Sequence, residues 1–264
     1  MPRAGSFDAG PWRVSTSYAS RIGHLNEVNE DSVCLERLAD GTWLFAVADG
    51  IGGYEGGEVA SAVTVATLAE VAAAAAGPPM LRLEAGVVEA NRRILQLQTA
   101  RGAKLAAMGT TLTALAIGPS GAAAVVHVGD SRLYRLAGGT LSLMTRDHNV
   151  GTELVREGLI DAAALAHHPQ RHMLTRALGV GPDAHPDTLS LTVAVGDAFV
   201  LVTDGMIDAL GEEGIARVAQ AHRGERWPEL GPALADAAGE HPNVDDATVV
   251  AVALHAPAPA GAGS

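Results

Sequence analysis

Short apolar runs rich in Val and Leu alternate along the chain with longer Ala-rich stretches whose apolar residues recur at helical spacing. The short runs predict β-strands, several of them too apolar to be buried on one face only. The predicted strands cover residues 43–48, 111–117, 122–128, 132–136, 198–203 and 247–254. The longer stretches predict helices over residues 58–75, 81–99, 152–157, 211–221 and 228–238.

The order of these elements points to an α+β fold. Two long helices follow the first predicted strand together, and strands then arrive in consecutive hairpins. This order favours packed antiparallel sheets with helices outside over a doubly wound parallel sheet. Residues 105–129 contain no Asp, Glu, Lys or Arg, as a membrane span would, but Gly-Pro-Ser-Gly at 118–121 interrupts them. A hairpin of two buried strands is therefore the interpretation of this segment.

Composition narrows the class of protein further. The chain has 264 residues, of which 48% are hydrophobic, enough for a substantial core. We expect a single domain over residues 13–255, with flexible tails at 1–12 and 256–264. A net charge of −12 argues against general nucleic-acid binding. Cys34 is the only cysteine, which excludes an internal disulfide framework and fits a reducing compartment. Residues 1–12 contain no apolar run long enough for a signal peptide, so we expect a cytoplasmic protein with no membrane segment.

Acidic residues stand at the ends of the predicted strands. Asp49, Asp130 and Asp204 each come just after an apolar run, while Asp245 and the pair Glu30-Asp31 precede one. Any one of these acids alone is a common turn residue. Together at one sheet edge they would repel one another, and oxygen ligands of this kind match Mg²⁺ or Mn²⁺. The set therefore predicts a hydrolytic site with two metal ions, with Asp49 as the best bridging ligand.

Six short motifs contain these acids and their neighbours. They are Asn29-Glu30-Asp31, Asp49-Gly50-Ile51-Gly52-Gly53 with Gly56-Gly57-Glu58-Val59-Ala60-Ser61, Gly109-Thr110-Thr111, Gly129-Asp130-Ser131-Arg132, Thr203-Asp204-Gly205 and Asp245-Asp246-Ala247-Thr248. In this order they resemble the motifs of the metal-dependent protein phosphatases, the protein phosphatase 2C (PPM) family, in its compact bacterial Ser/Thr form. The resemblance runs from about residue 14 to residue 254.

The resemblance implies a fold, a site and a reaction. The implied fold is a four-layer α-β-β-α sandwich, two central antiparallel sheets flanked by helix pairs. The implied activity is Mg²⁺- or Mn²⁺-dependent hydrolysis of phosphoserine and phosphothreonine in proteins, by in-line attack of a metal-bridging hydroxide. The catalytic residues would be Asp49, Asp204 and Asp245. The metal ligands for two ions and a third, weaker site would be Glu30, Asp31, Asp49, Gly50, Asp130, Asp204, Asp208 and Asp245.

One position departs from the family pattern. The family usually has an Arg that holds the substrate phosphate three residues before the Asn-Glu-Asp motif, where this chain has Asn26. Either Arg21 or another basic residue reaches the phosphate, or phosphate affinity is lower, or the protein is a weak enzyme. A catalytically weak phosphoprotein-binding module of the same fold is therefore the alternative function. A phosphatase for small metabolites is a third reading.

Other features bear on substrate contact and leaving-group protonation. His24, His148 and His172 are candidates for the general acid, although a structural role is the simpler expectation for each. By resemblance, residues 147–176 form a flap beside the site that contacts the phosphoprotein. The expected partners are phosphorylated substrates of a Ser/Thr kinase, and we expect a monomer.

Overall fold

The computed structural model describes residues 5–9, 12–24, 26–52, 56–101, 107–165, 168–242 and 245–257. These residues form two antiparallel sheets. Sheet 1 has the strand order β1 (Gly5–Ala9), β2 (Trp12–Arg21), β12 (Ala247–His255), β11 (Ala198–Val202), β8 (Arg132–Ala137) and β9 (Thr140–Leu143). Sheet 2 has the order β10 (Asp187–Thr192), β7 (Ala122–Val128), β6 (Leu112–Ile117), β4 (Trp43–Ile51) and β3 (Asp31–Arg37), with the short β5 (Gly109–Thr110) beside the end of β4.

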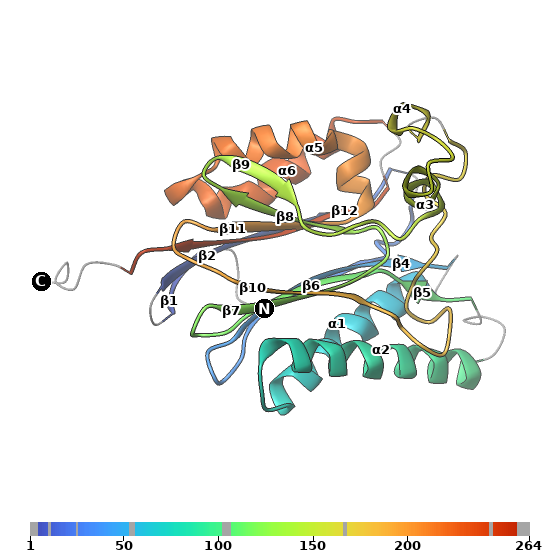
Figure 1. Cartoon of the computed structure of the whole chain (residues 1–264), viewed down its shortest axis with the longest axis horizontal. Coiled ribbons are helices and arrows are strands. Elements are labelled where there is room, and N and C mark those ends of the chain that lie inside the picture. Colours follow the sequence, from blue (N-terminus) through green and yellow to red (C-terminus); the bar gives the residue numbers. More distant parts are fainter. Residues whose placement is uncertain are drawn as a thin grey trace, which may run out of the picture.

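Helices cover the outer face of each sheet, so the predicted four-layer α-β-β-α sandwich is confirmed (Figure 1). Helices α1 (Gly57–Ala74) and α2 (Pro79–Arg101) pack on sheet 2. Helices α5 (Asp204–Ala221) and α6 (Leu230–Gly239) pack on sheet 1, with the 3-10 helix η2 (Gly224–Glu229) between them in sequence. The short helices α3 (Val150–Arg156) and α4 (Ala162–Leu165) lie beyond one end of the sheets.

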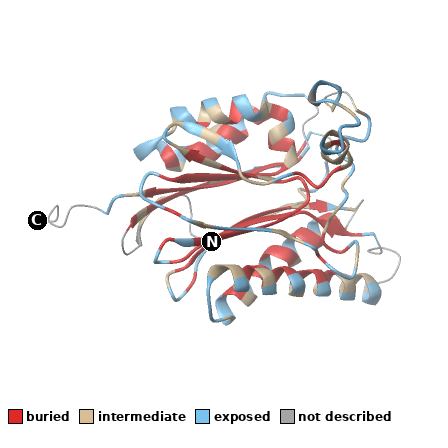
Figure 2. Ribbon diagram, in the orientation of Figure 1, coloured by how far each residue is buried: buried red, intermediate tan, exposed pale blue. Residues whose placement is uncertain are grey.

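The apolar strands face two cores at once, because each sheet has helices on one side and the other sheet on the opposite side. On β4, Phe45 and Val47 point between the sheets, whereas Leu44 and Ala46 pack under α1 and α2. A third core lies between sheet 1 and helices α5 and α6. In Figure 2 the buried residues accordingly fill both sheets and the helix faces that look toward them. This double burial explains why the strands are apolar runs without alternation.

Several strands were not predicted from the sequence, because they are not apolar runs. Strand β2 is rich in Ser and Thr, yet Ser17 is buried because its hydroxyl donates to Pro228 O (2.8 Å) and accepts from Gly231 N (2.8 Å). Strand β10 lies at a sheet edge and is largely exposed. Residues 5–9, which the sequence placed in the amino-terminal tail, form β1 against β2. Residues 1–4, 10–11 and 258–264 lie outside the described ranges, so the division into one domain with two tails stays a prediction.

One helix begins earlier than its sequence suggests. Helix α5 begins at Asp204, not at residue 211, because Gly211 adopts φ 62° and ψ 172° and splits a helix whose first half is short. Asp204 therefore stands in the first turn of a helix.

Helix α1 is long and apolar enough by composition to cross a membrane, but in this fold it packs against β3, β4 and α2.

Candidate active site

A cleft of about 520 Å³ opens at the end of the sandwich where β4 ends and β12 begins. Carboxylates from both sheets line it. Asp49 comes from β4 of sheet 2, while Asp204 follows β11 and Asp245 precedes β12, both of sheet 1. Glu30 and Asp130 complete the acidic lining. The structure thus brings together five of the acids that the sequence placed at strand ends.

Glycines allow the backbone segments that carry these acids to approach closely. A Cβ on Gly50 would collide with Gly57 O and would lie only 2.7 Å from Glu30 O. A Cβ on Gly205 would collide with Asp246 O and would lie 3.1 Å from Asp245 O. The Gly after each Asp is therefore required by contact with another segment, which places Asp49 beside Glu30 and Asp204 beside Asp245.

Two threonines fix the backbone of Asp49. The Asp49 N–H donates to Thr111 Oγ1 (3.0 Å), and Asp49 O accepts from Thr110 Oγ1 (2.8 Å) and from Thr111 N (2.8 Å). The Thr111 hydroxyl also bonds Ser131 Oγ at 2.7 Å, which joins this strand to the turn that carries Asp130. The Gly-Thr-Thr motif therefore holds the acids in place, a requirement for a site that must be formed before its ligand arrives.

Two buried carboxylate oxygens lack any protein partner among the described residues. Asp31 Oδ2 accepts from Thr203 Oγ1 (2.9 Å), but Asp31 Oδ1 and Asp204 Oδ1 accept no hydrogen bond. An unpaired buried carboxylate oxygen is strongly unfavourable, so atoms of this kind call for a cation. The residues present therefore fit divalent metal ions, and their all-oxygen character suits Mg²⁺ or Mn²⁺.

The electrostatics agree with an uncompensated acidic cluster. Burial, and then the charges of Asp204 and Asp31, raise the pKa of Asp49 well above its usual range. Burial is also the main cause of the raised pKa values of Asp31 and Asp204. Burial and the charge of Asp204 raise the pKa of Asp130 to about 8. The first turns of α1 and α5 lie at this cluster and contribute only partial positive charge.

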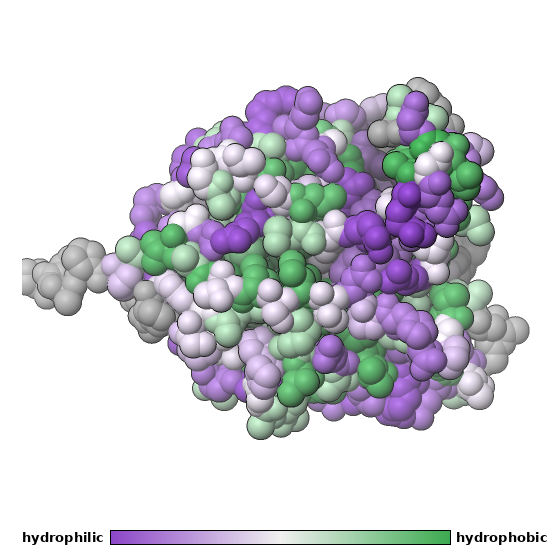
Figure 3. Space-filling model, in the orientation of Figure 1, coloured by the Kyte–Doolittle hydropathy of each residue, from purple (hydrophilic) through white to green (hydrophobic). Residues whose placement is uncertain are grey.

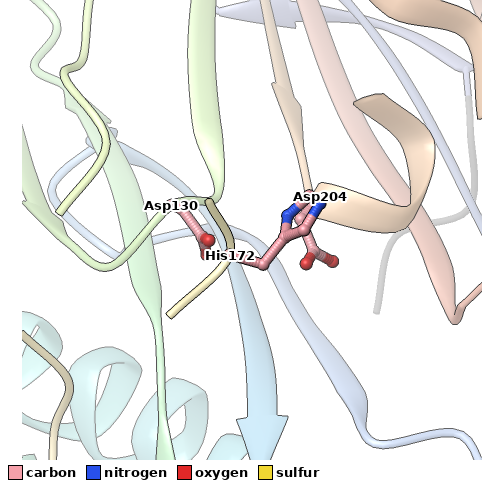
Figure 4. Close-up of side chains that lie close together, drawn as sticks. All are labelled: Asp130, His172 and Asp204. Carbon is pink, nitrogen blue, oxygen red and sulfur yellow. The ribbon is translucent and has the colours of Figure 1, made fainter. Parts of the chain in front are cut away.

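A second group of ligand atoms adjoins the cleft. Single ligand atoms of Asp130, His172 and Asp204 lie within 4.8 Å of one another, and Figure 4 shows the three side chains gathered at one point. They line a neighbouring cavity of about 180 Å³ together with Asp208, whose Oδ2 is 3.6 Å from His172 Nε2. In the sequence His172 was a candidate only for the general acid. Its position beside Asp130 could not be predicted, because the two residues are far apart along the chain.

The other two candidate histidines do not line the cleft. His148 is fully buried, its Nδ1 accepts from Gly129 N (3.1 Å), and its Nε2 lies 3.2 Å from Asp187 Oδ2. His24 is exposed. The burial and contacts of His148 therefore support a structural role and not that of the general acid.

The residue that the sequence placed at the substrate phosphate has a different contact. Asn26 is exposed and its Nδ2 donates to Asp245 Oδ1 at 2.7 Å. Arg21, suggested as a substitute cation, is turned the wrong way, because its guanidinium packs against Gly239 of α6 on the outer side of sheet 1.

Asp246 is a structural residue that the motif contained but the sequence did not explain. It is buried, and its two oxygens accept from the backbone N–H groups of Gly23 (2.7 Å) and Glu30 (2.6 Å). It therefore ties the segments on either side of Asn26 to the start of β12. The only signal for this role was its position beside Asp245.

Replacing Asp246 with Ala is expected to lower the free energy of unfolding by about 3–5 kcal/mol, because two charge-assisted hydrogen bonds are lost and two buried N–H groups are left unpaired. Asp246→Asn keeps the shape and one acceptor oxygen and should lose about half as much. Urea unfolding monitored by circular dichroism measures both. A loss below about 1 kcal/mol for Asp246→Ala would contradict this role.

Comparisons with known proteins were made on the sequence and on the fold. The family described as Protein phosphatase 2C matches residues 22–239. The serine/threonine protein phosphatase PstP of Mycobacterium tuberculosis is 36% identical over 205 residues, which cover 77% of this chain and 38% of that protein. The serine/threonine phosphatase stp of Listeria welshimeri is 32% identical over 206 residues, covering 76% of this chain and 81% of that protein.

Solved structures give the same result. The crystal structure of the M. tuberculosis serine/threonine phosphatase PstP superposes with a TM-score of 0.82 at 32% identity, covering 92% of this chain and 99% of that one. The catalytic domain of PstP in complex with two manganese ions superposes with a TM-score of 0.80 at 32% identity, covering 92% and 98%. This chain spans well under half of the length of the full-length PstP protein.

Proposed function

Because this chain belongs to the protein phosphatase 2C family, we propose that it is a Mg²⁺- or Mn²⁺-dependent phosphatase that hydrolyses phosphoserine and phosphothreonine in proteins. The observation that carries the proposal is the pair of buried, unpartnered oxygens, Asp31 Oδ1 and Asp204 Oδ1, within a cluster of carboxylates at a cleft. A related catalytic domain of the same fold holds two manganese ions.

The proposed roles of the acids follow their positions. Asp49, held by Thr110 and Thr111, would contact both ions, with the Gly50 carbonyl as a further ligand. Asp204 and Asp245 would hold the second ion, and Glu30 and Asp31 would act mainly through water. Asp130, Asp204 and Asp208 would form a third, weaker site, to which the position of His172 adds a nitrogen ligand. When bound, such ions supply an activated water and offset charge on the phosphoryl oxygens.

The chain's own residues provide the rest of the reaction's requirements. The two sheets fix the acids on rigid strand ends, so little rearrangement is needed during turnover. The segment that follows α4 supplies Leu174, Thr175 and Arg176 to one wall of the cleft. This wall matches the flap expected from the sequence, and we propose that it contacts the phosphoprotein.

The alternative of a phosphoprotein-binding module is less favoured. A module that only binds has no need for carboxylates whose close packing raises their pKa values. A small-metabolite phosphatase would use the same acids, so substrate size must be tested directly. We also propose action in the cytoplasm, for which the support is the buried free thiol of Cys34. We further propose that the protein acts as a monomer.

Hydrolysis of a phosphothreonine peptide with and without Mn²⁺ tests the proposal. We expect phosphate release that needs the metal and stops with a chelator, and a kcat/KM for the peptide well above that for small sugar or nucleotide monophosphates. Metal-independent turnover would exclude the proposed site chemistry. Equal turnover of peptides and small metabolites would favour the metabolite phosphatase.

A further inference from the structure

The cleft presents a charge problem for a phosphorylated substrate. Five carboxylates line it, and a phosphate dianion that approaches them meets like charge that the bound ions offset only in part. Asn26 carries no charge and Arg21 packs against α6. Among the described residues that line the cleft, the one Arg or Lys side chain is Arg176.

The backbone around Arg176 is tied down on both sides. Before it, Val150 N donates to Met173 O (2.8 Å) and Thr175 N donates to His148 O (2.8 Å). After it, Leu178 and Thr110 exchange two backbone hydrogen bonds, of 2.9 and 3.1 Å. Thr110 in turn pairs with Gly50. Arg176 therefore lies two residues before Leu178, which pairs with β5, and β5 pairs with the end of β4 that carries Gly50.

The guanidinium is oriented from outside the cleft. Arg176 Nη1 donates to Asp187 Oδ1 at 2.7 Å, and Asp187 Oδ2 lies 3.2 Å from His148 Nε2. Since His148 Nδ1 accepts the Gly129 N–H, the ring carries its proton on Nε2, the nitrogen that faces Asp187. In Figure 3 hydrophilic residues gather at this end of the visible face, near the α3 and α4 segment.

This arrangement leaves one edge of the guanidinium free. Within the described part of the chain, Nε and Nη2 of Arg176 form no hydrogen bond, and the side chain is 33% exposed. An Arg fork with two free N–H groups matches two oxygens of a phosphate. Its carboxylate partner restricts the rotation of the fork before the ligand arrives, which reduces the entropy lost on binding.

We propose that Arg176 binds the substrate phosphate and supplies the positive charge absent at Asn26, with Asp187 and His148 as the residues that position it. This inference rests on the proposed phosphatase function. It places the phosphate contact on the wall formed by residues 173–178, about 150 residues along the chain from the motif that contains the acids Glu30 and Asp31.

Steady-state kinetics of Arg176→Met with a small aryl phosphate tests the inference. We expect KM to rise by roughly ten- to a hundredfold while kcat changes by less than about threefold, since a charge-assisted hydrogen bond to the phosphate is lost. The inhibition constant of inorganic phosphate should rise by the same factor. Arg176→Lys should recover only part, because an ammonium lacks the fork.

Arg146→Met is the matched control. Arg146 also faces Asp187, at 3.8 Å, but it is 51% exposed and does not line the cleft, so its removal should leave KM within about twofold. Asp187→Asn should raise KM in the wild type and have no further effect in Arg176→Met, which a purely structural role would not produce. Asn26→Arg should lower KM and partly rescue Arg176→Met, whereas Asn26→Ala, which also loses the bond to Asp245, should not rescue it.

The outcomes separate this inference from the proposed function. If the wild type hydrolyses the substrate with Mn²⁺ and Arg176→Met has unchanged KM and unchanged phosphate inhibition, the inference is wrong and the function stands. If the wild type shows no metal-dependent turnover, the function fails. In that case calorimetric titration of Mg²⁺-loaded protein with inorganic phosphate decides the inference, which requires at least tenfold weaker binding by Arg176→Met.

Discussion

Asp204→Asn is expected to lower kcat by about 10³-fold and, at the same time, to make the metal-free protein more stable than the wild type. The first effect follows from the loss of a proposed anionic metal ligand at the end of β11, where Asp204 Oδ1 is buried without a partner among the described residues. Metal stabilisation of a transferring phosphoryl group amounts to several kcal/mol, and 1.4 kcal/mol corresponds to a factor of about ten in rate.

The second effect follows from repulsion among the acids. The charge of Asp204 raises the pKa values of Asp49, Asp31 and Asp130 in addition to their burial. Asn has the same shape without the charge, and its amide can donate to Asp49. In a chelator we therefore expect Tm to rise by ~3 °C, about 1 kcal/mol for a protein of this size. With Mn²⁺ the order should reverse, because only the wild type gains the full free energy of metal binding.

Steady-state kinetics with Mn²⁺ measures the fall in kcat, and differential scanning fluorimetry in EDTA and then in Mn²⁺ measures the change in Tm. Asp236→Asn is the control, because Asp236 is exposed on α6, away from the cleft, and the same substitution there should change neither activity nor Tm. A variant that is less stable than the wild type in EDTA would show that Asp204 is held by protein contacts. It would contradict the view that a cation is its missing partner.

The strands that could be predicted are those buried on both faces. Residues 43–48 read as an apolar run because Phe45 faces one core and Leu44 the other. Strands β2 and β10 could not be found in this way. Ser17 of β2 is buried through side-chain hydrogen bonds with η2 and α6, which come more than 200 residues later. Strand β10 is an edge strand with little burial, so no pattern marks it.

The residues of the candidate site likewise divide into those that the sequence could predict and those that it could not. The acids were predictable because each stands beside a strand end, and strand ends of one sandwich meet at a common edge. The contacts of Asp246, His172 and Arg176 were not, because each depends on a pairing between distant segments, such as Leu178 with Thr110. The sequence showed that Asn26 leaves a charge missing. It could not show which cation faces the cleft, since that depends on the direction in which Arg21 and Arg176 point.

The metal-free protein is expected to lose stability from this cluster as the pH rises from about 4 to 8. The folded pKa of Asp130 is about 8 and its ordinary value is 3.8. Between these values the folded protein holds a proton that the unfolded chain has released, so the free energy of unfolding falls as pH increases. The contribution is complete below pH 3.8 and is lost as the pH passes about 8. Glu30, Asp31, Asp49 and Asp204 have raised pKa values and act in the same direction.

The buried histidines act in the opposite direction at acid pH and must be separated. Burial lowers the pKa of His127 to about 4 and also lowers that of His148, so protonation of the unfolded chain destabilises the fold below pH 6.5. The difference between wild type and Asp130→Asn in EDTA cancels this contribution. We expect Asp130→Asn to match the wild type below about pH 4, to exceed it slightly at pH 5, and to exceed it at pH 8 by a few kcal/mol, or ~10 °C in Tm.

Manganese should reverse this dependence. Metal ions bind the deprotonated carboxylates, so their affinity rises over the same pH range in which the metal-free fold weakens. The Tm of the Mn²⁺-loaded wild type should therefore increase relative to the EDTA sample as pH goes from 5 to 8, and the increase should shrink in Asp130→Asn. Parallel curves with and without Mn²⁺ would mean that cations and protons do not compete for these oxygens. The acids would then have to be stabilised within the fold by some means other than a divalent ion.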